Sequence, residues 1–125
     1  MRALDTTVVV DYLRGMPAAV TLLEELAERG ELLIASEVVR FELLAGVRDL
    51  ARPALESFCS SVSWVPVDET VTREGGELAR RYGPSHDGID DLDHLIAATT
   101  LVLDADLLTT NVKHFPMLEG LQPAY

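Results

Sequence analysis

Residues 2–13, with the sequence RALDTTVVVDYL, place a short strand, a carboxylate and a helix in direct succession. The run that ends at Leu4 predicts a strand, and residues 6–13 predict a helix that ends before Gly15. Asp5 lies between them, where folding alone would favour an apolar side chain. A strand followed at once by a helix is the building unit of parallel α/β sheets.

Strand-like and helical patterns continue to alternate along the rest of the chain. We expect strands at residues 32–35, 62–67 and 107–109, a loop at 83–88, and helices at 17–29, 36–46, 52–60, 68–82 and 89–103. This alternation predicts an α/β fold in which helices cover both faces of a parallel sheet. Because no repeat or flexible linker interrupts the pattern, residues 1–125 are expected to form a single domain.

The composition limits the classes of protein to which the chain can belong. At 125 residues and 48% hydrophobic content, it is long enough to bury one substantial core. It contains neither an apolar stretch that would span a bilayer nor a signal-peptide pattern near Met1, so we expect a cytoplasmic protein without membrane contact. Its one cysteine, Cys59, excludes an internal disulfide and a cysteine-based metal site.

The net charge of −11 argues against strong non-specific binding to a phosphate backbone. The chain has only ten lysine and arginine residues, and Lys113 is its sole lysine. An acidic surface instead indicates a cationic partner, a metal site, or solubility alone.

Two further carboxylates interrupt apolar patterns in the same way as Asp5. Helical spacing places Glu42 on the face shared by Val38, Val39, Ala45 and Gly46. The same spacing places Asp93 beside Ile89, Ile96 and Ala97, near the start of its helix. Both side chains are therefore expected to point inward.

A shared divalent cation accounts for these three acids together. Burying one unpaired carboxylate costs several kcal/mol, which is comparable with the whole stability of a small domain. Asp5 follows the first strand, and Thr109 and Asn111 lie at the end of the last. Since parallel sheets bind ligands at the carboxyl ends of their strands, these side chains are expected to meet at one rim.

Each acid also has a structural alternative. Asp5 is placed to cap the following helix. Glu42 can form a buried ion pair with an arginine such as Arg48. Asp93 lies in a first helical turn, where the helix dipole favours acids, as it does for Asp90 and Asp91. Three independent coincidences would be needed for these alternatives to put all three acids at one site.

The chain resembles PIN-domain ribonucleases, particularly VapC-type toxins, in four ordered motifs: Leu4-Asp5-Thr6, residues 41–46 (FELLAG), residues 92–99 (LDHLIAAT) and residues 108–115 (LTTNVKHF). The resemblance covers nearly the whole chain. It implies a three-layer α/β/α sandwich around a mainly parallel sheet of four to five strands. It also implies hydrolysis of RNA to 5′-phosphate and 3′-hydroxyl ends, a homodimer, and a cognate antitoxin that covers the site.

The resemblance assigns metal-ligand roles to Asp5, Glu42 and Asp93, with supporting roles for Thr6 and Thr109. At the fourth position, many family members have an aspartate at or shortly after the Thr-x-Asn element, whereas this chain has Asn111 and His114. Asn111 is expected to assist by holding a metal-bound water. A further carboxylate is available from Asp90, Asp91 or Asp106.

The donor set predicts the chemistry. Hard oxygen ligands favour Mg²⁺, with Mn²⁺ as a substitute. A bound ion can polarise a phosphodiester and lower the pKa of an attacking water. Two other functions remain open from the sequence: a catalytically inactive PIN-like binding or dimerisation module, and a phosphoacceptor signalling domain.

Overall fold

The structure is a computed structural model and describes residues 1–83 and 88–125. Within these ranges the sheet has four strands: β1 (Arg2–Leu4), β2 (Leu33–Ser36), β3 (Ser63–Val65) and β4 (Asp106–Leu108). All three strand pairs are parallel, and the order across the sheet is β3-β2-β1-β4. The carboxyl end of β1 therefore lies between those of β2 and β4.

Six α-helices connect and cover the strands in the same part of the chain: α1 (Thr6–Leu13), α2 (Pro17–Glu28), α3 (Glu37–Gly46), α4 (Arg52–Cys59), α5 (Glu69–Tyr82) and α6 (Asp91–Val102). Two short 3₁₀ turns, η1 (Asp49–Ala51) and η3 (Val112–His114), complete the described elements. Ser36 caps α3 by accepting a hydrogen bond from the Val38 N–H at 3.1 Å, as its side chain predicts.

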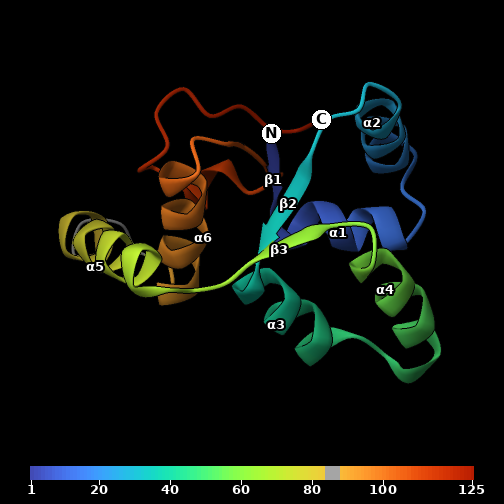
Figure 1. The fold of residues 1–125 in the computed structure, drawn as a ribbon, viewed down its shortest axis with the longest axis horizontal. Coiled ribbons are helices and arrows are strands. Elements are labelled where there is room, and N and C mark those ends of the chain that lie inside the picture. The colour runs from blue at the N-terminus through green and yellow to red at the C-terminus, as the bar shows by residue number, and fades with distance from the viewer. Residues whose placement is uncertain (84–87) are drawn as a thin grey trace.

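The helices lie on both faces of the sheet (Figure 1). On one side α5 and α6 pack together, on the other lie α1, α2 and α4, and α3 starts at the carboxyl end of β2. This arrangement confirms the predicted three-layer α/β/α sandwich, with a sheet that is entirely parallel. No helix in the described residues is both long and apolar enough to cross a membrane.

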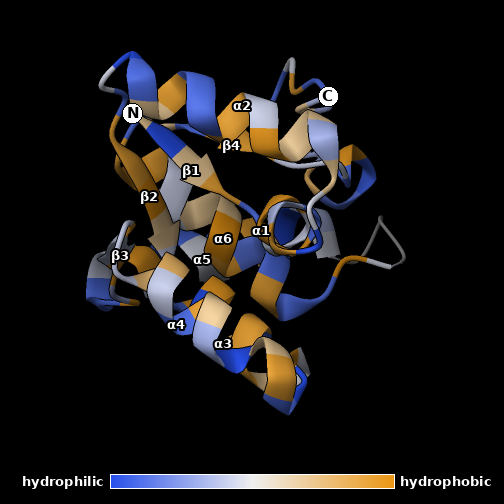
Figure 2. Ribbon diagram, turned by 90° about the vertical axis from the view of Figure 1, so that its right-hand side faces the viewer, coloured by the Kyte–Doolittle hydropathy of each residue, from blue (hydrophilic) through white to orange (hydrophobic). Residues whose placement is uncertain are grey.

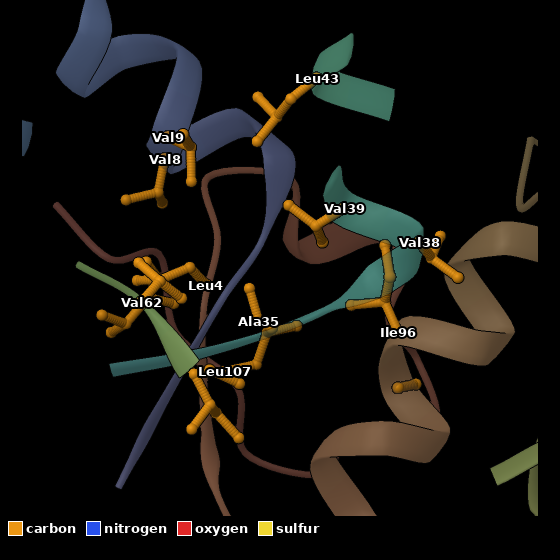
Figure 3. Close-up of a cluster of buried hydrophobic side chains, with 14 of the residues drawn as sticks. Leu4, Val8, Val9, Ala35, Val38, Val39, Leu43, Val62, Ile96 and Leu107 are labelled. Atoms are coloured by element: carbon orange, nitrogen blue, oxygen red, sulfur yellow. The ribbon is translucent and has the colours of Figure 1, made fainter. Parts of the chain in front are cut away.

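The core lies between these layers. Figure 3 shows Leu4 and Ala35 from the strands, Val8 from α1, Val38 from α3 and Ile96 from α6 in one cluster of buried side chains. Figure 2 shows the same distribution, with apolar residues along the strands and along α6. Because truncating such a buried side chain to alanine typically costs about 2 to 5 kcal/mol, this cluster fixes the strand ends on which the site depends.

Several element boundaries differ from the sequence predictions. The helix expected at 89–103 begins at Asp91 because Asp90 caps it, so Ile89 lies outside the helix rather than one turn before Asp93. The last strand ends at Leu108, and Thr109 follows it. The strand expected at 62–67 is limited to 63–65, and the one expected at 32–35 runs from 33 to 36. Of the predicted loop at 83–88, residues 84–87 lie outside the described residues.

Candidate active site

Asp5 lies directly after β1 and is only 5% exposed. Its N–H donates to the Leu108 carbonyl at 3.0 Å, which ties it to β4. Its Oδ2 accepts hydrogen bonds from Thr109 Oγ1 at 2.7 Å and from Thr7 Oγ1 at 3.2 Å. Although Asp5 occupies the N-cap position of α1, its side chain makes no capping hydrogen bond. The carboxylate is therefore held by the site and does not cap the helix.

Glu42 lies half-buried on α3, and its Oε1 accepts a hydrogen bond from Thr6 Oγ1 at 2.8 Å. Burial raises the pKa of Glu42, while the Thr6 hydroxyl opposes this shift. Repulsion from three neighbouring carboxylates raises the pKa further: Asp5, Asp90 and Asp93. The alternative of an ion pair with Arg48 is wrong, because no such pair is present among residues 1–83 and 88–125.

Asp93 lies in the first turn of α6 and is 9% exposed. It forms a capping box with Asp90: the Asp93 N–H donates to Asp90 Oδ1 at 3.0 Å, and the Asp90 N–H donates to Asp93 Oδ2 at 3.3 Å. His114 Nδ1 lies 3.2 Å from the same Oδ2. Burial raises the pKa of Asp93, and so does repulsion from Asp90 and Asp5, against the lowering effects of the Asp90 N–H and His114. The first-turn structural role expected as an alternative is thus present, and it coexists with a place in the acidic cluster.

The three acids share one pattern of hydrogen bonding. Protein donors hold one oxygen of each: Oδ2 of Asp5, Oε1 of Glu42 and Oδ2 of Asp93. The other oxygen of each accepts no hydrogen bond from the described residues. In that part of the chain, no three acidic, histidine or cysteine side chains converge closely enough to hold a metal ion between them. An open set of carboxylate oxygens at one rim fits Mg²⁺, which usually keeps several waters and binds one or two carboxylates directly.

The Thr109–Asn111 segment completes the rim. Thr109 is fully buried, and its hydroxyl both donates to Asp5 and accepts a hydrogen bond from the Asn111 N–H at 2.9 Å. The Asn111 residue itself is exposed. Its backbone N–H thus joins the site, and the residue lies at the solvent-exposed edge of the rim.

The three candidates for a further carboxylate at the site, Asp90, Asp91 and Asp106, differ in their position relative to Glu42 and Asp93. Asp90 is a charge neighbour of both Glu42 and Asp93. Asp91 is exposed and is not among the charges that shift either pKa. Asp106 begins β4, at the end of the strand away from Thr109, so the suggestion that it supplies a ligand is wrong.

Thr7 was not predicted as a site residue from the sequence, and His114 was noted only at the position where many relatives have an aspartate. The Thr7 hydroxyl contacts Asp5 Oδ2, lies 3.5 Å from Thr109 Oγ1 and accepts a hydrogen bond from the Thr110 N–H at 3.3 Å. His114 contacts Asp93. The available signals were the doubled threonine after Asp5, and a histidine near the position where relatives have an acid.

The PIN domain family matches residues 2–118, and the chain belongs to this family. It is 62% identical to Ribonuclease VapC19 of Mycobacterium tuberculosis over 125 residues, which is 100% of both chains. It is 39% identical to Ribonuclease VapC10 of the same organism, over 100% of this chain and 93% of that protein. These matches confirm the resemblance and leave the phosphoacceptor alternative without support.

Solved structures agree with this assignment. VapBC2 from Rickettsia felis, bound to a DNA fragment from its promoter, superposes with a TM-score of 0.83 at 25% identity, over 96% of this chain and 94% of that chain. A toxin–antitoxin complex from Klebsiella pneumoniae gives a TM-score of 0.82 at 19% identity, over 100% and 98% of the two chains, and this second likeness concerns the fold alone.

Proposed function

We propose that this chain is a divalent-metal-dependent endoribonuclease that acts as the toxin of a toxin–antitoxin pair. Membership in the PIN-domain family and 62% identity to a named ribonuclease support the activity. The observation that carries the proposal is the arrangement of Asp5, Glu42 and Asp93, which come from three separate elements and each keep one oxygen without a hydrogen bond from the described residues.

In this proposal Asp5, Glu42 and Asp93 would hold Mg²⁺, with Mn²⁺ as a substitute, and Asp90 is the additional acid nearest to them. When bound, the ion supplies Lewis-acid polarisation of the scissile phosphate and lowers the pKa of a water. The products would then be a 5′-phosphate and a 3′-hydroxyl.

The remaining residues orient the acids. Thr109 and Thr7 hold Asp5 Oδ2, and Thr6 holds Glu42 Oε1. These hydroxyls leave the second oxygen of Asp5 and of Glu42 without a hydrogen bond from the described residues. Asn111 would hold a water there, in line with its exposed position.

An antitoxin is the proposed protein partner, with RNA as the substrate. Glu42 lines a groove of about 380 Å³, together with Arg14, Arg48 and a set of apolar side chains that includes Val10, Leu13, Leu43, Val47 and Leu55. An apolar lining next to a cluster of acids suits a segment that carries both apolar and basic side chains. We further propose a single domain over residues 1–125, a homodimer, and the cytoplasm as the compartment in which RNA and antitoxin would be met.

The test is cleavage of end-labelled total RNA by the purified chain. Discrete fragments are expected with Mg²⁺ or Mn²⁺, and none with EDTA or with Asp93→Asn. Asp104→Asn makes the same change at an exposed position after the far end of α6, so it serves as the matched control and should cut like the wild type.

The alternative of an inactive binding module makes a different prediction for the same experiment. RNA of every class would stay intact with the wild-type chain in Mg²⁺ and Mn²⁺, although calorimetry would still detect metal binding. That result would overturn the proposed function.

A further inference from the structure

The segment of residues 118–125, here termed the tail strap, is attached to the active-site region at its end. The Ala124 N–H donates to the Thr109 carbonyl at 2.9 Å. The Tyr125 hydroxyl donates to Asp11 Oδ2 on α1 at 2.6 Å, across 114 residues of sequence. Two different hydrogen bonds therefore join the last residues of the strap to Thr109, which follows β4, and to α1.

The tail strap also packs against the core through its partly buried Leu118 and Leu121. Phe115 and Met117 anchor the chain just before the strap, since they are 1% and 8% exposed. Between the strap and the neighbouring β4 and α6 lies a cavity of about 490 Å³, lined on the strap side by residues 118–124. The hydrogen bonds at Ala124 and Tyr125 add to this apolar packing and fix where the end of the strap lies.

The Tyr125–Asp11 contact is a short, charge-assisted hydrogen bond at the surface, where Tyr125 is 37% exposed. Its 2.6 Å length is typical of a hydroxyl that donates to a carboxylate. Partial burial and the Asp11 carboxylate both raise the pKa of Tyr125, whose hydroxyl is a donor at neutral pH even at its ordinary pKa.

Both hydrogen bonds of the strap are made to residues that are connected to Asp5 by a few covalent or hydrogen bonds. Thr109, whose carbonyl accepts from the strap, uses its hydroxyl to hold Asp5 Oδ2 at 2.7 Å. Asp11 lies on α1, and the first turn of that helix carries Thr7, which also contacts Asp5 Oδ2. A strap fixed to both elements limits their movement relative to each other.

We propose that Tyr125 and Asp11 form a latch that positions Thr109, and through it Asp5, for RNA cleavage. Tyr125 is then a positioning residue rather than a catalytic one. The inference rests on the proposed function for its effect on cleavage, but the positioning itself can be measured without RNA or metal.

The test compares Tyr125→Phe with the wild type by amide hydrogen exchange and by steady-state cleavage. Loss of the latch should speed exchange of the Thr110 and Asn111 amides, which bond to Thr7 Oγ1 and Thr109 Oγ1, by about fivefold or more. It should lower kcat by about tenfold with KM changed less than about twofold, because a small misplacement of a reacting group slows the chemical step.

Matched variants separate positioning from general damage. Tyr12→Phe also removes one tyrosine hydroxyl from the protein, and within residues 1–83 and 88–125 that hydroxyl has no hydrogen-bond partner, so exchange and kcat should stay at wild-type values. Asp11→Ala removes the latch from the other side and should reproduce Tyr125→Phe. Asp11→Asn keeps an acceptor oxygen and should restore both readouts to within about twofold of the wild type.

Each result bears on the proposal separately from the proposed function. Unchanged exchange at Thr110 and Asn111 in Tyr125→Phe would overturn the latch, even if kcat fell, because Tyr125 would then act by some other route. Faster exchange with an unchanged kcat would also overturn it. A wild-type chain that cuts no RNA would instead refute the proposed function, while the exchange data would still report whether the latch holds Thr109.

Discussion

At the scale of single residues, the site combines acids that repel one another with hydroxyls that hold two of them, Asp5 and Glu42, in place. Glu42 shows the cost of this arrangement. Burial and the nearby carboxylates raise its pKa above the ordinary value of 4.5, which means that folding disfavours its charged form. A divalent ion between the acids would remove that penalty.

This shift predicts a pH-dependent stability for the metal-free protein. A raised carboxyl pKa contributes stability that is present below the unfolded-state pKa and is lost as the pH rises through the folded-state pKa. Glu42→Gln keeps an acceptor for Thr6 and abolishes the titration. We therefore expect the variant to gain stability relative to the wild type between about pH 4 and about pH 8. Urea unfolding with EDTA at both pH values measures the difference.

Glu77→Gln is the matched control for this measurement, since it removes one acid from an exposed position on α5. If Glu42→Gln gained no more stability than Glu77→Gln on going to the higher pH, the electrostatic cost assigned to Glu42 would be wrong.

A second prediction concerns Thr109, whose buried hydroxyl links Asp5 to the Asn111 N–H. Thr109→Val keeps the shape but leaves both partners without their hydrogen bond, which typically costs about 1 to 3 kcal/mol. RNA cleavage should fall by about tenfold or more. Thr109→Ser retains the hydroxyl and should keep most of the activity. Equal activity of the two variants in the RNA cleavage assay would show that the hydroxyl does not orient Asp5.

The sequence was enough to find the acids but not every residue that holds them. Asp5, Glu42 and Asp93 each break a local apolar pattern, so they could be found without knowing any long-range contact. Thr7, by contrast, meets Thr109 across 102 residues, and Tyr125 meets Asp11 across 114. No local pattern in the sequence predicts these two pairs of contacts. They depend on the order of the strands in the sheet and on the path of the last residues across the fold.

At the scale of elements, capping residues define where a helix starts more precisely than the spacing of hydrophobic residues does. The apolar pattern suggested that the last helix starts at residue 89, but the capping box between Asp90 and Asp93 starts it at Asp91. Both signals are present in the sequence. The box satisfies backbone N–H groups that the pattern does not account for, so it sets the first helical residue.

The packing of α5 against α6 makes a third prediction, from two adjacent glycines on α5. A Cβ at Gly75 would lie 2.9 Å from Leu95 Cδ2, whereas a Cβ at Gly76 would meet nothing within 4 Å. Gly76→Ala should therefore stabilise the protein by up to about 1 kcal/mol, through helix propensity alone. Gly75→Leu should destabilise it by about 1 to 3 kcal/mol, because the larger side chain has to separate the helices.

Thermal unfolding of both variants checks the pair. If Gly76→Ala and Gly75→Leu both raised or both lowered the free energy of unfolding, the prediction would be wrong. Contact with α6 would then not distinguish the two positions.

At the scale of the whole molecule, the three-layer fold followed from the alternation of strands and helices, but the order of strands did not. Alternating elements require crossovers between parallel strands, and helices on both faces follow from that. The order β3-β2-β1-β4 also depends on the edge of the sheet at which each successive strand is added. That choice places β4 beside β1, and with it Thr109 beside Asp5.

The last prediction concerns the net charge of −11, which acts over the whole surface rather than at the site alone. A basic antitoxin segment would be steered toward such a surface, and salt screens this attraction beyond a Debye length of about 10 Å at 0.1 M. We expect the association rate of the antitoxin to fall by about tenfold or more between about 50 and about 500 mM NaCl. The dissociation rate should change far less, because the apolar side chains that line the groove at Glu42 would hold the bound segment. Surface plasmon resonance yields both rates from one salt series, so the dissociation rate serves as the internal control. An association rate indifferent to ionic strength would show that the excess of acid keeps the protein soluble without guiding its partner.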